Sequence, residues 1–105
     1  MNLPEVISDL VNAQNNFDST KYANCFVETA VVFDEGKTYN GKREIENWIK
    51  KANEDYQVKM KPLEYLESEQ TLKAEISGSF PGSPAVLTYY YDFKNDLIQT
   101  LKIVQ

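Results

Sequence analysis

The sequence predicts an α+β protein in which three helices, all in the first half of the chain, pack on one face of an antiparallel sheet. Apolar residues in that half recur with the helical period of about 3.6 residues. From Gln57 onward they alternate with polar residues, as in strands. Helices that precede a sheet in this order must cover one of its faces. The 105 residues fit a single domain, 1–105.

The first two helices are expected before residue 30. Asn2 can cap the first one, and Pro4 sits in its first turn, where a missing N–H costs little. Asp18 caps a shorter second helix. The apolar stripe of the first helix is Leu3, Val6, Ile7, Leu10 and Val11, and the inner side of the second is Tyr22, Cys25, Phe26 and Thr29.

A short strand, 30–33, is predicted between the second helix and the third, which begins after Gly41. Pro62 marks an edge strand or a bulge in the first strand of the later meander, because proline donates no hydrogen bond to a ladder. Turns at 81–84 and 95–96 separate the remaining strands. The inner face of the third helix is Ile45, Trp48, Ile49 and Ala52.

Charge and composition exclude several classes of function. The net charge is −5, which makes nucleic acid and anionic membranes unfavourable partners. The N-terminus is acidic, and no apolar run approaches the roughly 20 residues of a membrane span, so a cytoplasmic location is expected.

Residue chemistry narrows the choice further. The chain has no histidine, which leaves carboxylate, tyrosine and lysine for chemistry. Cys25 is the only cysteine, so no internal disulfide forms, and a buried structural thiol is expected. The acidic residues lack oxygen-ligand spacing, and neither a metal nor a cofactor is predicted.

Three stretches of the chain carry a family resemblance. They are 15–22 (NNFDSTKY), 26–34 (FVETAVVFD) followed by 39–45 (YNGKREI), and 91–98 (YDFKNDLI). On these residues the whole chain resembles the nuclear transport factor 2-like superfamily, nearest to its SnoaL-like and ketosteroid-isomerase-like branches. The resemblance implies a cystatin-like α+β roll, in which a strongly curved antiparallel sheet forms a cone. It also implies an apolar pocket at the open end and, commonly, a dimer through the outer face of the sheet.

Asp34 is the sharpest candidate for catalysis. It falls where the resemblance places the general base of ketosteroid isomerases. A carboxylate that follows an apolar strand and faces an apolar cavity has its charged form desolvated, so its pKa rises and it can take a proton from carbon next to a carbonyl. The other interpretation is a turn aspartate that accepts backbone N–H bonds in Asp34-Glu35-Gly36.

Tyr89 and Lys102 are the next candidates. A two-residue turn at 95–96 predicts that the two lie side by side on the inward face. Tyr89 also falls where the isomerases keep an acid that donates to the oxyanion, and Lys102 could strengthen that bond. Alternatively, Tyr89 is a core residue and Lys102 reaches the rim. The resemblance departs from the isomerases at Leu10, where they carry a catalytic tyrosine, so half of the oxyanion hole is missing or replaced.

Two further surfaces are predicted. Aromatic side chains form the walls of the apolar pocket. An apolar outer face of the last hairpin forms a two-fold dimer. The pocket walls are Tyr22, Phe26, Phe33, Trp48 and Tyr91, and the dimer face is Thr88, Tyr90, Leu101 and Ile103. Two functions follow: a cone that binds a small apolar or carbonyl-bearing molecule and transfers a proton through Asp34, in an isomerase, cyclase or dehydratase type of reaction, or a non-catalytic dimeric ligand carrier or scaffold.

Overall fold

The computed structural model describes residues 1–105 and contains three α-helices and six strands. The helices are α1 (Glu5–Asn15), α2 (Ser19–Ala23) and α3 (Lys42–Tyr56). The strands are β1 (Phe26–Asp34), β2 (Lys37–Asn40), β3 (Lys59–Leu66), β4 (Thr71–Ser77), β5 (Ala85–Lys94) and β6 (Leu97–Val104), with a 3-10 turn, η1 (Glu67–Glu69), before β4. None of the helices has the length and apolar character needed to cross a bilayer.

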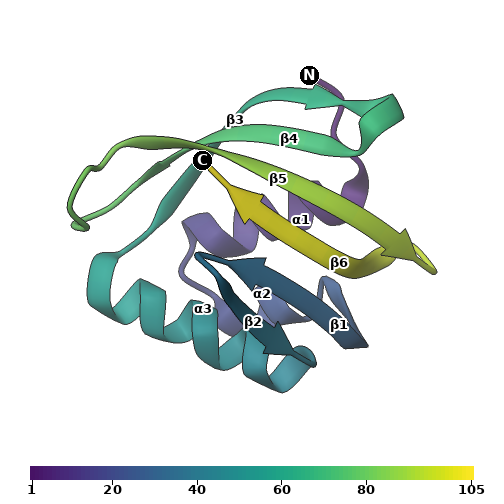
Figure 1. The fold of residues 1–105 in the computed structure, drawn as a ribbon, viewed down its shortest axis with the longest axis horizontal. Coiled ribbons are helices and arrows are strands. Elements are labelled where there is room, and N and C mark those ends of the chain that lie inside the picture. Colours follow the sequence, from purple (N-terminus) through teal and green to yellow (C-terminus); the bar gives the residue numbers. More distant parts are fainter.

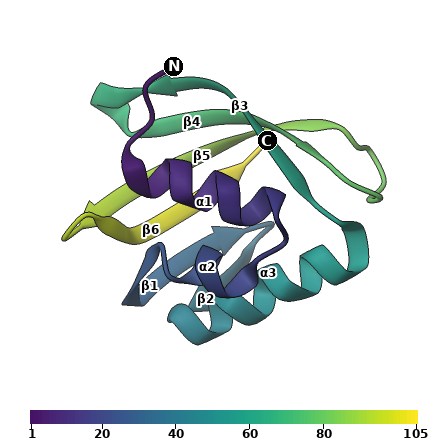
Figure 2. The ribbon, with the colours of Figure 1, turned by 180° about the vertical axis from the view of Figure 1, so that it is seen from behind.

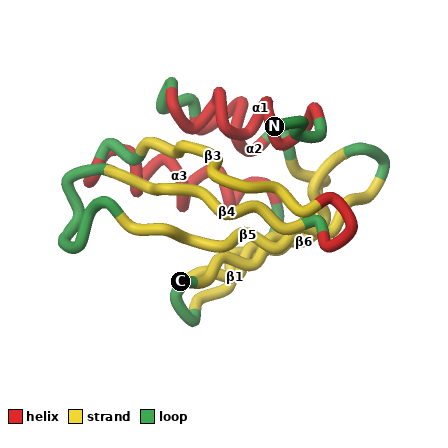
Figure 3. Tube along the Cα trace, turned by 90° about the horizontal axis from the view of Figure 1, so that it is seen from above, coloured by secondary structure: helices red, strands yellow, loops and turns green.

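The six strands form one sheet in the order β2-β1-β6-β5-β4-β3 (Figure 1). The sheet is mixed, because β1 and β6 run parallel while all other neighbours are antiparallel. Seen from behind, α1 lies across the sheet with α2 and α3 beside it (Figure 2). From above, α1 and α2 lie on one side of the curved strands (Figure 3). The α+β fold with helices on one face of a curled sheet is therefore confirmed.

The predicted helices form, with different ends. The part of the apolar stripe that lies within α1 is buried, and Leu3 precedes the helix. The N-cap is Pro4, not the predicted Asn2, and it makes no side-chain capping bond. Asp18 caps α2 as predicted, accepting a hydrogen bond from the Lys21 backbone N–H at 3.0 Å. The prediction that Cys25, Phe26 and Thr29 belong to this helix is wrong, because α2 ends at Ala23 and the chain enters β1 almost at once.

Two side-chain amides, Gln14 and Asn15, fasten the C-terminal end of α1. The Gln14 side chain donates to Asn53 Oδ1 on α3 at 2.8 Å and to the Val58 carbonyl at 2.7 Å. Asn15 exchanges two hydrogen bonds with the backbone of Met60, at 2.7 and 2.9 Å. These bonds tie α1 to α3 and to the edge strand β3. They hold the helix across the sheet and so keep the concave face covered.

Pro62 lies in the edge strand β3, and the β3–β4 register shifts just after it, so both features predicted for this proline are confirmed. The hairpin between β5 and β6 also turns where predicted, since Lys94 pairs with Leu97. The register then shifts by one residue, because Phe93 pairs with Ile98 but Asp92 pairs with Thr100. Gln99 is the extra residue of this β-bulge.

The bulge reverses the predicted facing of β6. Tyr89 pairs with Ile103, and Tyr90 pairs with Lys102, which is exposed on the convex face. The predicted pairing of Tyr89 with Lys102 is wrong, because an inserted residue moves every later side chain to the other face. Leu101 and Ile103, predicted for the outer dimer face, are buried in the core instead.

Phe33 also lies on the convex face. It pairs with Lys102 in the neighbouring strand, and its side chain is 41% exposed. The prediction that Phe33 walls a pocket is therefore wrong. The strand begins earlier than expected, at Phe26, and burial alternates only from Ala30 onward, because Glu28 and Thr29 are both exposed.

Candidate functional site

Asp34 ends β1 at the point where the sheet brings three strands together on its concave face. In the register, Asp34 pairs with Ile103 of β6, and Ile103 pairs with Tyr89 of β5. Paired residues of neighbouring strands point to the same side of a sheet. Asp34 and Tyr89 are therefore two strands apart on one face, with an apolar side chain between them. This row places a carboxylate and a phenol where a small molecule could touch both.

The Asp34 carboxyl is half-buried, and its pKa is raised from 3.8 to about 6. Burial is the main cause, because it disfavours the charged form, and the neighbouring negative charge of Glu35 adds to it. The nearby Trp48 side chain opposes the rise by favouring the carboxylate. No backbone N–H of the 34–36 turn donates to this side chain. The environment is the desolvated one expected for a general base, not that of a capping turn residue.

Aromatic rings surround this carboxyl from three elements. Trp48 of α3 stacks on Tyr39 of β2, with ring centroids 5.2 Å apart. The edge of Tyr22 from α2 meets Trp48 at 6.2 Å. The charge of Asp34 helps to raise the pKa of both tyrosines, after burial. We call Tyr22, Tyr39 and Trp48 the aromatic cluster.

Tyr89 and Tyr91 continue the concave face along β5. Their rings stack with centroids 6.3 Å apart, and burial raises both pKa values well above the ordinary range, so both phenols stay protonated. Tyr91 is only 3% exposed, and its hydroxyl has no hydrogen-bond partner. An unpartnered buried hydroxyl costs roughly 1–3 kcal/mol. A polar atom of a bound molecule or a water could remove that cost.

Most of the predicted site residues lie together on the helix-covered side of the sheet, and two lie on its opposite, convex face. Tyr22, Phe26 and Tyr91 lie in the core under the helices, and Trp48 lies at its partly exposed edge. Lys102 and Phe33 lie on the convex face, as described above. Tyr39 was missed by the sequence analysis. The sequence feature that could have identified it is the two-residue turn Glu35-Gly36. This turn sets the β1–β2 register, in which Tyr39 pairs with the inward-facing Val32.

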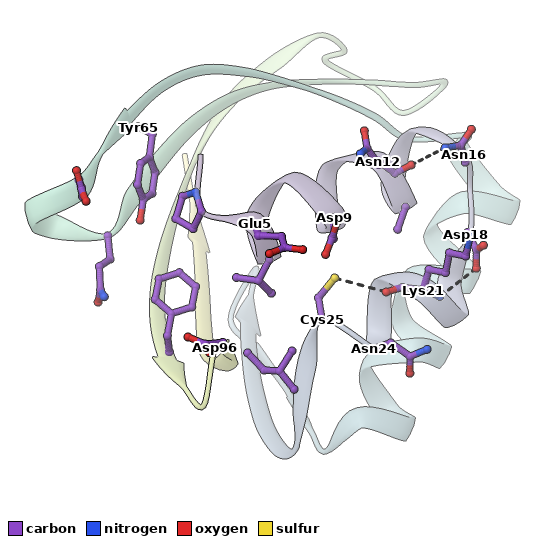
Figure 4. Close-up of a pocket in the computed structure, with 17 residues that line it drawn as sticks. Glu5, Asp9, Asn12, Asn16, Asp18, Lys21, Asn24, Cys25, Tyr65 and Asp96 are labelled. Atoms are coloured by element: carbon purple, nitrogen blue, oxygen red, sulfur yellow. Dashed lines mark hydrogen bonds between the residues drawn. The ribbon is translucent and has the colours of Figure 1, made fainter. Parts of the chain in front are cut away.

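A large hollow of the surface lies away from Asp34. It is a groove of about 1120 Å³ between α1, α2 and the tip of the β5–β6 hairpin (Figure 4). Five carboxylates and a single lysine line it, and none of the predicted site residues does. The carboxylates are Glu5, Asp9, Asp18, Glu67 and Asp96.

The groove shows no further sign of chemistry. Cys25 lies at its wall, and burial, with the nearby charge of Asp9, raises the pKa of this thiol to about 11. The thiol is buried, as predicted, and is not activated. No group of three or more acidic, cysteine or histidine side chains is arranged to hold a metal ion anywhere in the chain.

Comparisons with known proteins show which proteins share this fold. No family model matches the sequence, and a search of curated proteins finds no match. Among solved structures, a proposed polyketide cyclase from Sinorhizobium meliloti is 32% identical with a TM-score of 0.89, covering 97% of this chain and 95% of that one.

Two more distant structures share the fold. A protein with a ketosteroid isomerase-like fold from Catenulispora acidiphila, in complex with trimethylamine, is 16% identical, with a TM-score of 0.86 over 99% of this chain and 87% of that one. A computationally designed binder of 17-OHP is 16% identical, with a TM-score of 0.74 over 95% and 88%. On the 32% identity over nearly its full length, the chain belongs to the nuclear transport factor 2-like superfamily, in its SnoaL-like, ketosteroid isomerase-like branch.

Proposed function

We propose that this protein binds a small apolar, carbonyl-bearing molecule on the concave face of the sheet, and that Asp34 removes a proton from the carbon next to the carbonyl. The observation that carries the proposal is the half-buried Asp34 carboxyl with a pKa near 6, set among aromatic rings. A base with this pKa is largely ionised at neutral pH and still accepts a proton readily. Similarity to a proposed polyketide cyclase supports the same class of ligand.

Tyr89 is the hydrogen-bond donor to the substrate in this proposal. It lies on the same face as Asp34, and its phenol stays protonated, so it can donate a hydrogen bond to the oxygen that becomes negative as the proton leaves. Tyr91, stacked on Tyr89, carries the hydroxyl that lacks a partner. The entrance is the side of Trp48 and Tyr39, which are only partly buried, whereas the tyrosines behind them are buried.

The test is exchange of the carbon-bound proton for deuterium, followed by NMR on ketones that raise the melting temperature of the protein. The wild type should exchange the proton, at a rate that falls as pH drops through about 6, because the base becomes protonated. Asp34→Asn should lose about 100-fold or more of that rate. Asp92→Asn removes one charge from an exposed position of β5 and should keep it. An unchanged rate in Asp34→Asn would refute the assignment of the base.

A non-catalytic ligand carrier is the second candidate. It is favoured by Leu10, which is fully buried in α1 at the position where ketosteroid isomerases carry a catalytic tyrosine. In this case the ketones that raise the melting temperature would bind to the wild type and to Asp34→Asn, and neither protein would exchange the proton. Exchange by the wild type alone would exclude it.

We also propose a two-fold dimer through the convex face. After correction of the register, Thr88 and Tyr90 remain on this face, together with Phe33. Phe33 and Tyr90 are 41% and 46% exposed, and Lys102 lies between them in the row. Sedimentation should give a dimer for the wild type and a monomer for Tyr90→Lys. A monomeric wild type at micromolar concentration would contradict the proposal.

A further inference from the structure

We propose that the Asp34 site also takes a small organic cation, a tertiary or quaternary alkylammonium group, held between the Asp34 carboxylate and the rings of Trp48 and Tyr39. The inference rests on the ligand site of the proposed function but not on its proton transfer. It is carried by two features of the site, a carboxylate without an ion pair and two partly exposed aromatic rings beside it.

The Asp34 carboxylate has no cation beside it. The only ion pair in the chain joins Lys51 and Asp55 on α3. Lys37 faces Asp34 across the β1–β2 hairpin, but its ammonium makes no ion pair with it. The groups that act on the carboxyl from the surrounding elements bring no positive charge. They are Glu35 of the hairpin, Tyr22 of α2, Tyr39 of β2, Trp48 of α3 and Tyr89 of β5.

The rings provide the second half of the site. A cation within about 6 Å of a ring centroid is attracted by the negative face of the ring, and tryptophan is the strongest of these rings. Tyr39 pairs with Val32, two residues before Asp34, so its ring lies on the same face of the sheet as the carboxyl. Trp48 stacks on Tyr39 and acts on the Asp34 carboxyl, so both rings are near it. Both rings are partly exposed. Tyr39 belongs to the four-residue edge strand β2, which pairs only with β1.

Charge separates this ligand from a neutral one. An alkylammonium group stabilises the ionised carboxylate, so its affinity should increase as pH rises through about 6. A neutral apolar ligand buries the carboxyl further and favours the protonated form, so its affinity should fall over the same range. An ion-paired carboxylate is also a weaker base. The cation is therefore expected to bind and to inhibit proton exchange, not to react.

The test compares choline with 3,3-dimethyl-1-butanol, which has the same shape with a neutral carbon in place of nitrogen. The chain has one tryptophan, Trp48, so its selectively excited fluorescence reports directly on the site. Near pH 8 choline should bind about tenfold more tightly than the alcohol, a difference of about 1.4 kcal/mol. Near pH 5 the preference should shrink as Asp34 becomes protonated.

Two variants test whether the Asp34 carboxylate causes the preference for choline. Asp34→Asn should abolish the preference for choline, and Asp92→Asn, the matched loss of one charge, should keep it. Equal or tighter binding of the alcohol would overturn the inference and leave the proposed apolar ligand site intact. A preference for choline that survives in Asp34→Asn, or no response to choline at millimolar concentration, would also overturn it. The deuterium exchange assay on ketones, run without choline, tests the proton transfer separately.

Discussion

Replacement of Asp34 by asparagine should stabilise the protein at neutral and alkaline pH and leave its stability unchanged in acid. The folded-state pKa of about 6 lies above the ordinary value of 3.8, so folding favours the protonated carboxyl. The stability that this group contributes is complete below about pH 4 and is lost as pH rises through about 6. Asparagine stays neutral throughout, so the variant avoids the loss.

The expected gain in stability follows from the pKa shift of Asp34. Two pKa units correspond to about 3 kcal/mol of linkage. Asp34 is only half-buried, and solvent screening reduces this to about 1–2 kcal/mol. For a domain of about 100 residues, each kcal/mol moves the melting temperature by roughly 4–8 °C. Near pH 8 Asp34→Asn should therefore melt several degrees above the wild type.

The assay is thermal unfolding of the wild type, Asp34→Asn and Asp92→Asn over a pH series. The difference between Asp34→Asn and the wild type should grow between about pH 4 and pH 7, and subtracting the effect of Asp92→Asn removes the general effect of one charge. A difference that is constant over this range would refute the reasoning. So would a variant that is less stable than the wild type near pH 8, because it would mean that the folded state favours the carboxylate.

Three further variants test other parts of the structure. Gln14→Ala should lower the free energy of unfolding by about 2–3 kcal/mol in urea titrations, because it leaves buried polar groups on α3 and before β3 without partners; a loss below about 0.5 kcal/mol would contradict this. Gly78→Ala should cost about 1–3 kcal/mol, since an added Cβ would lie 2.6 Å from the carbonyl oxygen of Tyr56, and an unchanged melting temperature would refute the clash. Trp48→Phe should move the carboxyl pKa of Asp34 further above 6 in an NMR titration, because the Trp48 side chain opposes the rise in this pKa; a lower pKa would show that Trp48 does not favour the charged form.

Local pattern predicted the main elements of this fold because most segments obey one period. The stripe of α1 and the alternation in β4 and β5 follow directly from burial of one face. Asp34 was singled out because the resemblance places a general base there, and its position after an apolar stretch gave the physical reason for its desolvation. The environment of a residue could therefore be predicted from the sequence where it depends only on the residue's own strand.

Features set by pairing between distant strands could not be predicted in the same way. The bulge at Gln99 has no proline or glycine to mark it, and it alone decides that Lys102 faces solvent. The length of β1 depends on parallel pairing with β6, which joins residues more than 60 positions apart in the chain. Tyr39 was missed for a related reason, since β2 is too short to show a period of its own.

The bulge at Gln99 makes the last strand unusually sensitive to changes in length. Removing that single residue would exchange the interior and exterior positions from Thr100 to Val104, moving a lysine inward and two large aliphatic side chains outward. Substitutions along the same strand change one position at a time. When homologous chains are aligned, a one-residue gap placed on the wrong side of Gln99 would therefore match core positions with solvent positions. Similarity scored over those residues would then compare buried side chains with exposed ones.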